Sequence, residues 1–428
     1  MMLHPRAVLP LLRRRLQRSP ITVVTGARQT GKTTLVRDLL PRTEEAPSVY
    51  ISLDDPDERI RLAADPVRRL DHGPRLVILD EVQKQPELLD SVKLLADSRK
   101  GHKFLLLGSS QILLLRKVRE TLAGRASLID LWPLALAERV EDREVPQCGL
   151  DLVWREAEKG LRRLTQSAPS VEHARLWRKR SEEHLRWGGY PGLELLEEAE
   201  RPAWIRDFRR TYLERDLADL GRVEDLDQFA LAQNLFAART GQLLSYSEVA
   251  KELGVAVNTV KRYLRFLEIS YQVFLLRPFL PTVGARLVKS PKLHWTDVGL
   301  ARMLAERPSL SDGPLFETYV CGELLRWTSW QTDPPDLHFY RLYGGREVDF
   351  VLHSASRVLA IEAKAGERVY AGDARPLADF LAAKIPGADR GAERLGIIVT
   401  RGRETRQLTT HVWAVPDWQL FGPRSKGA

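Results

Sequence analysis

The chain has 428 residues, of which 43% are hydrophobic and 29% are charged, and its formal net charge is +9. This composition excludes collagen-like, disordered and disulfide-rich proteins, and the length suffices for two to four compact domains. The two cysteines, Cys148 and Cys321, lie far apart and have no metal-type partners, so we expect a reducing, cytoplasmic compartment.

The first twenty residues form a short basic segment. Four of its five arginines follow the apolar run Leu9–Leu12 instead of preceding it, which is not the pattern of a secretory signal. We predict an amphipathic helix that leads into the first strand. No apolar run in the chain approaches the length needed to cross a bilayer, so no membrane partner is expected.

A phosphate-binding motif, G-x-x-x-x-G-K-T, follows the apolar run Ile21–Val24 and precedes a helix-like stretch. Side chains at Gly26 and Gly31 would keep the backbone N–H groups away from a triphosphate, which explains the glycines. We expect Lys32 to reach the β- and γ-phosphates and Thr33 to bind Mg²⁺. The expected nucleotide-binding residues are Gly26, Ala27, Arg28, Gln29, Thr30, Gly31, Lys32, Thr33 and Thr34.

A second buried run, Leu76–Leu79, ends in an acidic pair. We expect Asp80 to hold Mg²⁺, directly or through water, and Glu81 to polarise the attacking water. A small-molecule kinase needs no such water-activating carboxylate, so the pair favours hydrolysis. The chain contains no N/T-K-x-D guanine-reading sequence, and ATP is therefore the predicted nucleotide.

A third strand, predicted at Lys103–Leu107, ends at Gly108, Ser109 and Ser110. Because strand ends line the phosphate crevice in such sheets, Ser109 is a candidate for sensing the γ-phosphate or positioning water. Arg125 is a candidate arginine finger, acting either on its own nucleotide or, in a homo-oligomer, on that of a neighbouring copy. A surface salt bridge is an equally good interpretation of Arg125.

These motifs together resemble the prokaryotic AAA-type P-loop ATPases that carry a C-terminal domain of uncharacterised function. One departure is Leu107, which stands where members of that family often have threonine before the Gly-Ser-Ser segment. The resemblance implies an N-terminal ATPase but no particular biological process. The matching segments are Thr25–Thr33, Asp80–Gln83, Gly108–Ser110, Leu122–Arg125, Leu131–Leu134 with Glu138, Gly188–Pro191, Tyr212–Leu217, Leu293–Leu300 and Gly345–Lys364.

The segment from Pro146 to Thr240 has helical spacing, interrupted at Gly188–Gly192, and predicts a helical connector with one sharp turn. Within it, the apolar stripe that contains Trp204 and Phe208 is expected to pack on the ATPase. Because this stretch also matches the family, a role in signalling is the alternative.

The next segment, from Ser245 to Lys292, predicts a helix-turn-helix. Ser247 is expected to cap the first helix, Gly254 to break it, and the second helix to begin near Asn258. Strands at Tyr271–Leu276 and Ala285–Lys289 would form the wing. The candidate DNA-binding residues, which fall away from the apolar face of the second helix, are Asn258, Thr259, Lys261, Arg262 and Arg265. Winged helices also serve as protein-docking or packing modules, and that alternative stays open.

The last segment contains a D…E-x-K pattern. Asp349 enters the predicted strand Val348–Leu352, and Glu362 and Lys364 share one face of the predicted strand Val358–Ala363. With Glu317 upstream, these residues resemble the core of restriction-endonuclease-like nucleases. There, Glu317, Asp349 and Glu362 would bind Mg²⁺ and Lys364 would activate water. Short patterns of this kind also arise by chance, and such strands can persist as a binding scaffold without cleavage.

The overall prediction is an α/β protein in four parts. These are a P-loop AAA-type ATPase domain (1–145), a helical connector (146–240), a winged helix-turn-helix (241–292) and a nuclease-like α/β domain (293–428). The predicted function is ATP binding and hydrolysis that switches engagement of double-stranded or branched DNA. The part that would engage DNA is the winged helix with the nuclease-like domain (241–428), here called the rear half. The alternatives are an ATP-gated, metal-dependent nuclease and a protein-interaction switch without DNA.

Overall fold

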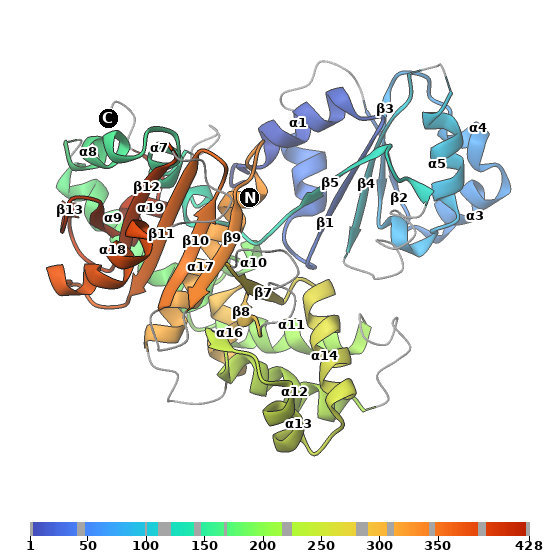
Figure 1. The fold of residues 1–428 in the computed structure, drawn as a ribbon. Helices are drawn as coiled ribbons and strands as arrows, with labels where there is room; N and C mark the ends of the chain where they lie inside the picture. The colour runs from blue at the N-terminus through green and yellow to red at the C-terminus, as the bar shows by residue number, and fades with distance from the viewer. Residues whose placement is uncertain are drawn as a thin grey trace.

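The structure is a computed structural model of the chain. It describes residues 3–40, 48–98, 101–109, 121–140, 147–166, 169–215, 225–279, 290–305, 312–341, 347–383 and 391–424, without the side chains of 109 and 212–215. Figure 1 shows the N-terminal sheet on one side, the C-terminal sheet on the other, and the helices α11–α14 between and below them.

The N-terminal part is a parallel sheet with the strand order β2-β3-β4-β1-β5. Its strands are β1 (Ile21–Gly26), β2 (Val49–Ser52), β3 (Leu76–Asp80), β4 (Lys103–Ser109) and β5 (Ala126–Asp130). The apolar run of β1 is buried on both faces, as expected of a central parallel strand. The sheet agrees with the predicted P-loop fold, in which strand ends meet at one edge.

Helices cover both faces of this sheet. They are α1 (Leu9–Arg18), α2 (Lys32–Thr34), the π-helical turn η1 (Leu35–Leu39), α3 (Pro56–Ala64), α4 (Pro66–Leu70), the 3₁₀ turn η3 (Val82–Lys84) and α5 (Leu88–Ala96). The predicted amphipathic helix before the first strand is confirmed as α1, which buries its leucines and keeps arginines in its last turn.

The segment predicted as a helical connector contains a run of helices, and the 3₁₀ turn η4 (Leu136–Glu138) precedes it. The helices of the segment are α7 (Gly149–Glu156), α8 (Glu158–Gln166), α9 (Val171–Trp187), α10 (Pro191–Glu194), α11 (Arg201–Arg215) and α12 (Leu226–Ala238). The predicted sharp turn lies between α9 and α10. There Gly188 has a φ of 80°, and a Cβ on it would lie 2.0 Å from the Asp297 carboxylate. Only glycine fits this close approach.

The predicted helix pair is present as α13 (Tyr246–Leu253) and α14 (Val257–Ile269), separated by Gly254 in the left-handed conformation. The cap of the first helix differs from the prediction. The side chain of Ser245, not that of Ser247, accepts the Glu248 N–H, because Ser245 holds the extended backbone conformation that precedes the helix.

Three short strands lie beside the helix pair: β6 (Gln242–Leu243), β7 (Val273–Pro278) and β8 (Lys292–Trp295). The strand predicted at Tyr271–Leu276 corresponds to β7. The strand predicted at Ala285–Lys289 lies outside the described residues, and the described antiparallel partner of β7 is β8.

β7 also pairs in parallel with β9, so the described strands form one sheet with the order β13-β14-β12-β11-β10-β9-β7-β8-β6. The remaining strands are β9 (Asp336–Arg341), β10 (Glu347–His353), β11 (Arg357–Lys364), β12 (Glu393–Thr400), β13 (Arg406–Gln407) and β14 (Val412–Pro416). The strands predicted for the D…E-x-K pattern are thus present as β10 and β11, an antiparallel pair.

Helices lie on both faces of the C-terminal sheet. They are α16 (Val298–Leu304), α17 (Asp312–Ser329), the 3₁₀ turn η5 (Ala371–Ala374), α18 (Arg375–Ala382) and α19 (Asp417–Phe421). α17 packs on the face that carries Phe350 and Ile361, and α18 packs on the face that carries Val351 and Ala360. This alternation follows from the two-residue period of the strands.

Candidate functional site

The glycine loop connects β1 to α2 at the carboxyl edge of the N-terminal sheet. A Cβ on Gly26 would lie 2.2 Å from the carbonyl oxygen of Leu131, and Gly31 has a φ of 91°. Both positions therefore require glycine, one for close approach and one for its backbone conformation. The loop therefore leads directly into α2, and N–H groups at the start of a helix can bind an anion such as a phosphate.

Lys32 lies inside this loop. Its Nζ donates hydrogen bonds to the carbonyl oxygens of Gly26 (3.0 Å) and Ala27 (2.7 Å), and the residue is only 7% exposed. The Thr30 hydroxyl also donates to Ala27 (2.9 Å). The ammonium group of Lys32 is thus held against the glycine loop, close to where a phosphate would contact the loop.

Thr33 and Asp80, predicted as partners in magnesium binding, are in contact. The Thr33 hydroxyl donates to Asp80 Oδ2 at 2.8 Å, and the Tyr50 hydroxyl donates to the same oxygen at 2.7 Å. Burial, followed by the hydrogen bond to Asp80, raises the pKa of Tyr50. Tyr50 was not predicted, because its role depends on β2 lying beside β3.

Glu81 follows Asp80 in the left-handed conformation, with a φ of 56°. Such a conformation is costly for a residue with a side chain and often marks a functional site. The Gln83 amide donates a hydrogen bond to the Glu81 carboxylate and holds it beside the loop.

A buried arginine from the N-terminal segment, Arg6, donates a hydrogen bond to the backbone of the glycine loop. Arg6 is 5% exposed; it donates to the carbonyl oxygens of Thr30 (2.8 Å) and Trp132 (2.7 Å) and pairs with Glu138 at 3.2 Å. Glu138 also accepts the Ala7 N–H at 2.7 Å. These contacts join the P-loop to the 3₁₀ turn η4, which contains Glu138. Arg6 was not predicted.

A pocket of about 540 Å³ opens over the loop, and the connector supplies its opposite wall. Trp204 of α11 is part of that wall and stacks on Phe208, with ring planes 13° apart. The described lining residues are Leu3, His4, Arg6, Arg28, Gln29, Gly31, Lys32, Thr33, Thr34, Leu39, Glu81, Leu134, Pro191, Gly192, Leu195, Trp204 and Thr211. Glycine loop and connector therefore enclose one cavity.

The other two candidates in the ATPase are placed differently. Ser109 ends β4 opposite Gly26, but its side chain lies outside the described part of the structure. Arg125 directly precedes β5, whose first residue pairs with Ile21 at the start of β1. It therefore lies at the opposite edge of the sheet from the P-loop, where its Nε contacts Asp97 at 2.6 Å.

The second helix of the helix pair buries its predicted apolar face, including Val260, Tyr263, Leu264 and Leu267. Of the candidate DNA-binding residues, Asn258, Lys261, Arg262 and Arg265 are exposed, and Thr259 is half-buried. Arg265 pairs with Glu268 at 3.8 Å, which is a weak solvated contact. Most of the predicted set therefore lies on the solvent side of α14.

The predicted C-terminal residues come together around a lysine that was not predicted. Lys292 Nζ lies 2.9 Å from Glu317 Oε1 and 3.5 Å from Asp349 Oδ1, and it also pairs with Glu347. The lysine is 3% exposed. It projects from β8, more than fifty residues before the D…E-x-K pattern.

Glu362 and Lys364 extend this cluster along β11. Lys364 Nζ donates to Glu362 Oε1 at 2.9 Å, and Asp349 Oδ2 accepts the Ala363 N–H at 2.9 Å. Burial, followed by the charge of Asp349, raises the pKa of Glu317 to about 8 and that of Glu362 to about 7. The carboxylates are thus crowded into a buried space.

Within the described ranges, no three or more His, Cys, Asp or Glu side chains are arranged to hold a metal ion. None of the described helices is long and apolar enough to cross a membrane.

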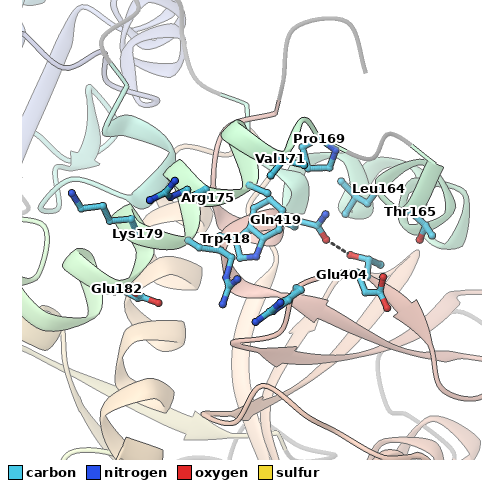
Figure 2. A pocket seen from close by; sticks show the side chains of 14 residues that line it. Leu164, Thr165, Pro169, Val171, Arg175, Lys179, Glu182, Glu404, Trp418 and Gln419 are labelled. Carbon is cyan, nitrogen blue, oxygen red and sulfur yellow. Dashed lines mark hydrogen bonds between the residues drawn. The ribbon is translucent and has the colours of Figure 1, made fainter.

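A second cavity, of about 700 Å³, lies between α8 and α9 on one side and, on the other, α19 with the residues that precede β13. Figure 2 shows Trp418 at its centre and the hydrogen bond from Thr405 to Gln419, which measures 2.6 Å. Its walls carry basic residues, among them Arg175 and Lys179, as well as the acidic residues Glu182 and Glu404. It has no glycine loop, so the cavity over Lys32 is the better candidate for a nucleotide.

Three family models match successive parts of the chain. An AAA domain matches residues 18–140, a domain of unknown function (DUF8612) matches 178–311, and another domain of unknown function (DUF4143) matches 312–420. The AAA match covers the glycine loop and Asp80. The chain therefore carries a P-loop ATPase-type domain followed by two domains without an assigned activity.

Two mycobacterial proteins are similar over most of the chain. The uncharacterized proteins Rv2008c of Mycobacterium tuberculosis and Mb2031c of Mycobacterium bovis are each 30% identical over 368 residues, which is 85% of this chain and 74% of theirs.

Solved structures show a distant likeness. The Bacillus subtilis DNA clamp loader delta protein is 13% identical, with 61% of this chain and 88% of that chain covered and a TM-score of 0.25. A DNA polymerase III gamma subunit-related protein of Thermotoga maritima is 15% identical, with 61% and 97% covered and a TM-score of 0.23. Scores this low do not establish a shared fold.

Proposed function

The chain belongs to the same family as Rv2008c and Mb2031c, and we propose that it binds and hydrolyses ATP at the P-loop and thereby switches engagement of DNA by its rear half. One observation carries the proposal. The Thr33 hydroxyl and the Asp80 carboxylate meet at 2.8 Å directly beside a loop whose glycines are sterically required. That combination suits a magnesium-bound triphosphate.

The residues at this point fit a magnesium ion. Mg²⁺ prefers oxygen ligands, and the Thr33 hydroxyl and Asp80 carboxylate supply them at the end of the glycine loop. A bound Mg²⁺ would neutralise charge on the phosphate oxygens. Tyr50, which donates to the same Asp80 oxygen, orients that carboxylate.

The remaining residues have separate roles in hydrolysis. Lys32 would exchange its hydrogen bonds to the loop carbonyls for bonds to phosphate oxygens and stabilise the charge that develops during bond cleavage. Glu81, held by Gln83, would orient the attacking water. Ser109, at the end of the neighbouring strand, would sense the γ-phosphate.

Arg125 is proposed only as a residue that acts on a neighbouring copy. It lies at the amino edge of the sheet, a strand length away from the loop of its own chain. A homo-oligomer in which that edge faces the next P-loop would bring it to the nucleotide. Mixed oligomers that combine Arg125→Ala chains with Lys32→Ala chains would test this by their ATPase rate.

The hydroxyl of Tyr271 supports a link between the nucleotide and the rear half. Tyr271 lies between α14 and β7, and its hydroxyl is 2.7 Å from that of Thr25, which immediately precedes the glycine loop. A change in the loop would therefore reach the base of α14. We propose that α14 and its neighbouring strands act as a winged helix that contacts DNA phosphates through Lys261, Arg262 and Arg265.

The experiment that tests the ATPase combines two variants. Lys32→Ala should abolish nucleotide binding, whereas Glu81→Gln should retain binding and lose turnover, because only the second residue acts on the attacking water. Calorimetry with ATP and a phosphate-release assay measure the two properties. Wild-type release rates in both variants would refute the assignment.

DNA engagement has its own test. Phosphate contacts displace counterions, so DNA affinity should fall steeply with salt, and removing Lys261, Arg262 and Arg265 should flatten that slope by about one unit per residue. Absent or salt-independent DNA binding would instead favour a nucleotide-controlled switch for protein partners.

An ATP-gated nuclease is the second candidate, and the approach of Asp349, Glu362 and Lys364 on one strand pair favours it. In that case Asp349→Ala and Lys364→Ala would abolish DNA cleavage in Mg²⁺ or Mn²⁺ without changing the ATPase rate. The ammonium group of Lys292 lies in the same cluster, where it contacts Asp349, one of the residues expected to bind metal.

A further inference from the structure

We propose that Lys292 is the built-in cation of the C-terminal carboxylate cluster and that its ammonium group occupies the place in which a divalent cation would otherwise bind, between Glu317, Asp349 and Glu362. The proposal concerns the rear half alone. It does not depend on ATP binding or on DNA engagement.

The contacts of Lys292 are those of a cation at the centre of an acidic site. Its Nζ lies 2.9 Å from Glu317 Oε1 and 3.5 Å from Asp349 Oδ1, and it pairs with Glu347 as well. Its side chain is 4% exposed, so these charges interact with little screening by water. The ammonium group therefore contacts two of the three carboxylates predicted to bind metal.

The cluster remains rich in negative charge. Four carboxylates, those of Glu317, Glu347, Asp349 and Glu362, face the two ammonium groups of Lys292 and Lys364. Buried charges without partners are costly, and the side chains of Glu317 and Glu362 are only 17% and 13% exposed. Removal of Lys292 would enlarge the excess, which protons or a divalent cation would then have to offset.

Two buried polar groups at the cluster lack hydrogen bonds. His294, two residues after Lys292 on β8, is fully buried, and neither of its ring nitrogens has a hydrogen-bond partner among the described residues. Its Nε2 points at the cluster, 3.7 Å from Glu317 Oε1. Glu362 Oε2 is likewise buried and without a hydrogen-bond partner. Such groups are rare in proteins unless a ligand or ion satisfies them.

The chemistry of these groups indicates the class of ion. His294 presents an imidazole nitrogen beside these carboxylates, 3.7 Å from Glu317 Oε1, and imidazole is a common metal ligand. A set of carboxylates with one neutral imidazole suits a first-row divalent ion such as Mn²⁺.

The test compares Mn²⁺ binding by full-length proteins without nucleotide, all carrying Asp80→Asn to remove the carboxylate at the P-loop. Titration followed by electron paramagnetic resonance counts the bound ions. Lys292→Met should bind one Mn²⁺ per chain at least about tenfold more tightly than the parent. Lys292→Arg retains the charge and should behave as the parent does.

Two further variants separate a lost site from a lost fold. Lys292→Met/Glu347→Gln conserves the net charge and keeps the three proposed carboxylate ligands and His294, so it should fold and gain the ion. Lys292→Met/Glu317→Gln removes a ligand and should lose the gain. Folded Lys292→Met/Glu347→Gln that binds Mn²⁺ no more tightly than the parent would overturn the proposal. So would a parent protein that already binds one Mn²⁺ as tightly through Glu317.

Discussion

The hydroxyl of Tyr271 lies 2.7 Å from that of Thr25 and donates a hydrogen bond of 2.5 Å to Asp130. The three side chains join the segment between α14 and β7 to the ends of β1 and β5. Trp132 packs edge-on against the same tyrosine ring at 5.0 Å. Because Gly26 follows Thr25 directly, this junction connects the start of the P-loop to the segment between α14 and β7 through side-chain hydrogen bonds.

Tyr271→Phe should uncouple the two halves. The substitution keeps the ring against Trp132 but removes the hydroxyl, at a cost of about 1 kcal/mol in stability. ATP affinity should stay near wild type, while the ratio of DNA affinities measured with and without ATP should approach one. Tyr246→Phe is the control, because Tyr246 lies on α13, away from this junction. If the ratio of DNA affinities with and without ATP were unchanged in Tyr271→Phe, the Tyr271 hydroxyl would not couple ATP binding to DNA binding.

Arg6→Ala should destabilise the ATPase and weaken ATP binding together. The change leaves the Glu138 carboxylate, which is 2% exposed, without its cation, and it frees the Thr30 carbonyl. Loss of one partner of a buried ion pair costs about 3–5 kcal/mol. Urea unfolding and ATP titration measure the two effects. Arg18→Ala, at the exposed end of α1, should change stability by less than about 0.5 kcal/mol. Equal effects of Arg6→Ala and Arg18→Ala would show that the contacts of Arg6 with Glu138 and Thr30 do not stabilise the domain.

Trp204→Ala should weaken binding of ATP but not that of inorganic tripolyphosphate. The indole lines the nucleotide pocket opposite the glycine loop, where we expect it to contact the base. Stacking of a base on an aromatic ring contributes about 1–3 kcal/mol. Competition titrations with both ligands distinguish base from phosphate contacts, and Trp204→Phe should restore most of the affinity. Equal losses for ATP and tripolyphosphate would show that Trp204 acts on the pocket as a whole.

The C-terminal cluster should make stability depend on pH. Burial and neighbouring charge raise the pKa of Glu317 to about 8 in the folded chain, above its ordinary value of 4.5. Between these values the unfolded chain has lost the proton that the folded chain retains, so this contribution to stability declines as the pH rises from about 4.5 to 8. Glu317→Gln should show a smaller decline in melting temperature over that range. Parallel curves for both proteins would contradict the crowded cluster.

Local patterns predicted the elements that depend on neighbouring residues. The glycine loop, the buried run before Asp80, the two helices around Gly254 and the strands of the D…E-x-K pattern all appear where periodicity and turn residues placed them. Thr33 and Asp80 also meet, because parallel strands of such a sheet end at one edge.

The residues that sequence reasoning missed act across long separations in the chain. Arg6 meets Glu138, Tyr271 meets Thr25, and Lys292 meets Asp349 only after distant elements pack together. No spacing rule connects such residues, because their contacts depend on strand order and on the path of the connector. The available signal at Lys292 was its spacing of two residues from His294, which places both side chains on one face of the strand Lys292–Trp295.

The most direct test of the account is calorimetric titration of the full-length chain with ATP in Mg²⁺, run beside Lys32→Ala. The account predicts one ATP bound per wild-type chain, with affinity that falls when Mg²⁺ is withdrawn, and no binding by Lys32→Ala. Absence of heat with the wild-type chain, or equal affinity in Lys32→Ala, would contradict nucleotide binding at the glycine loop.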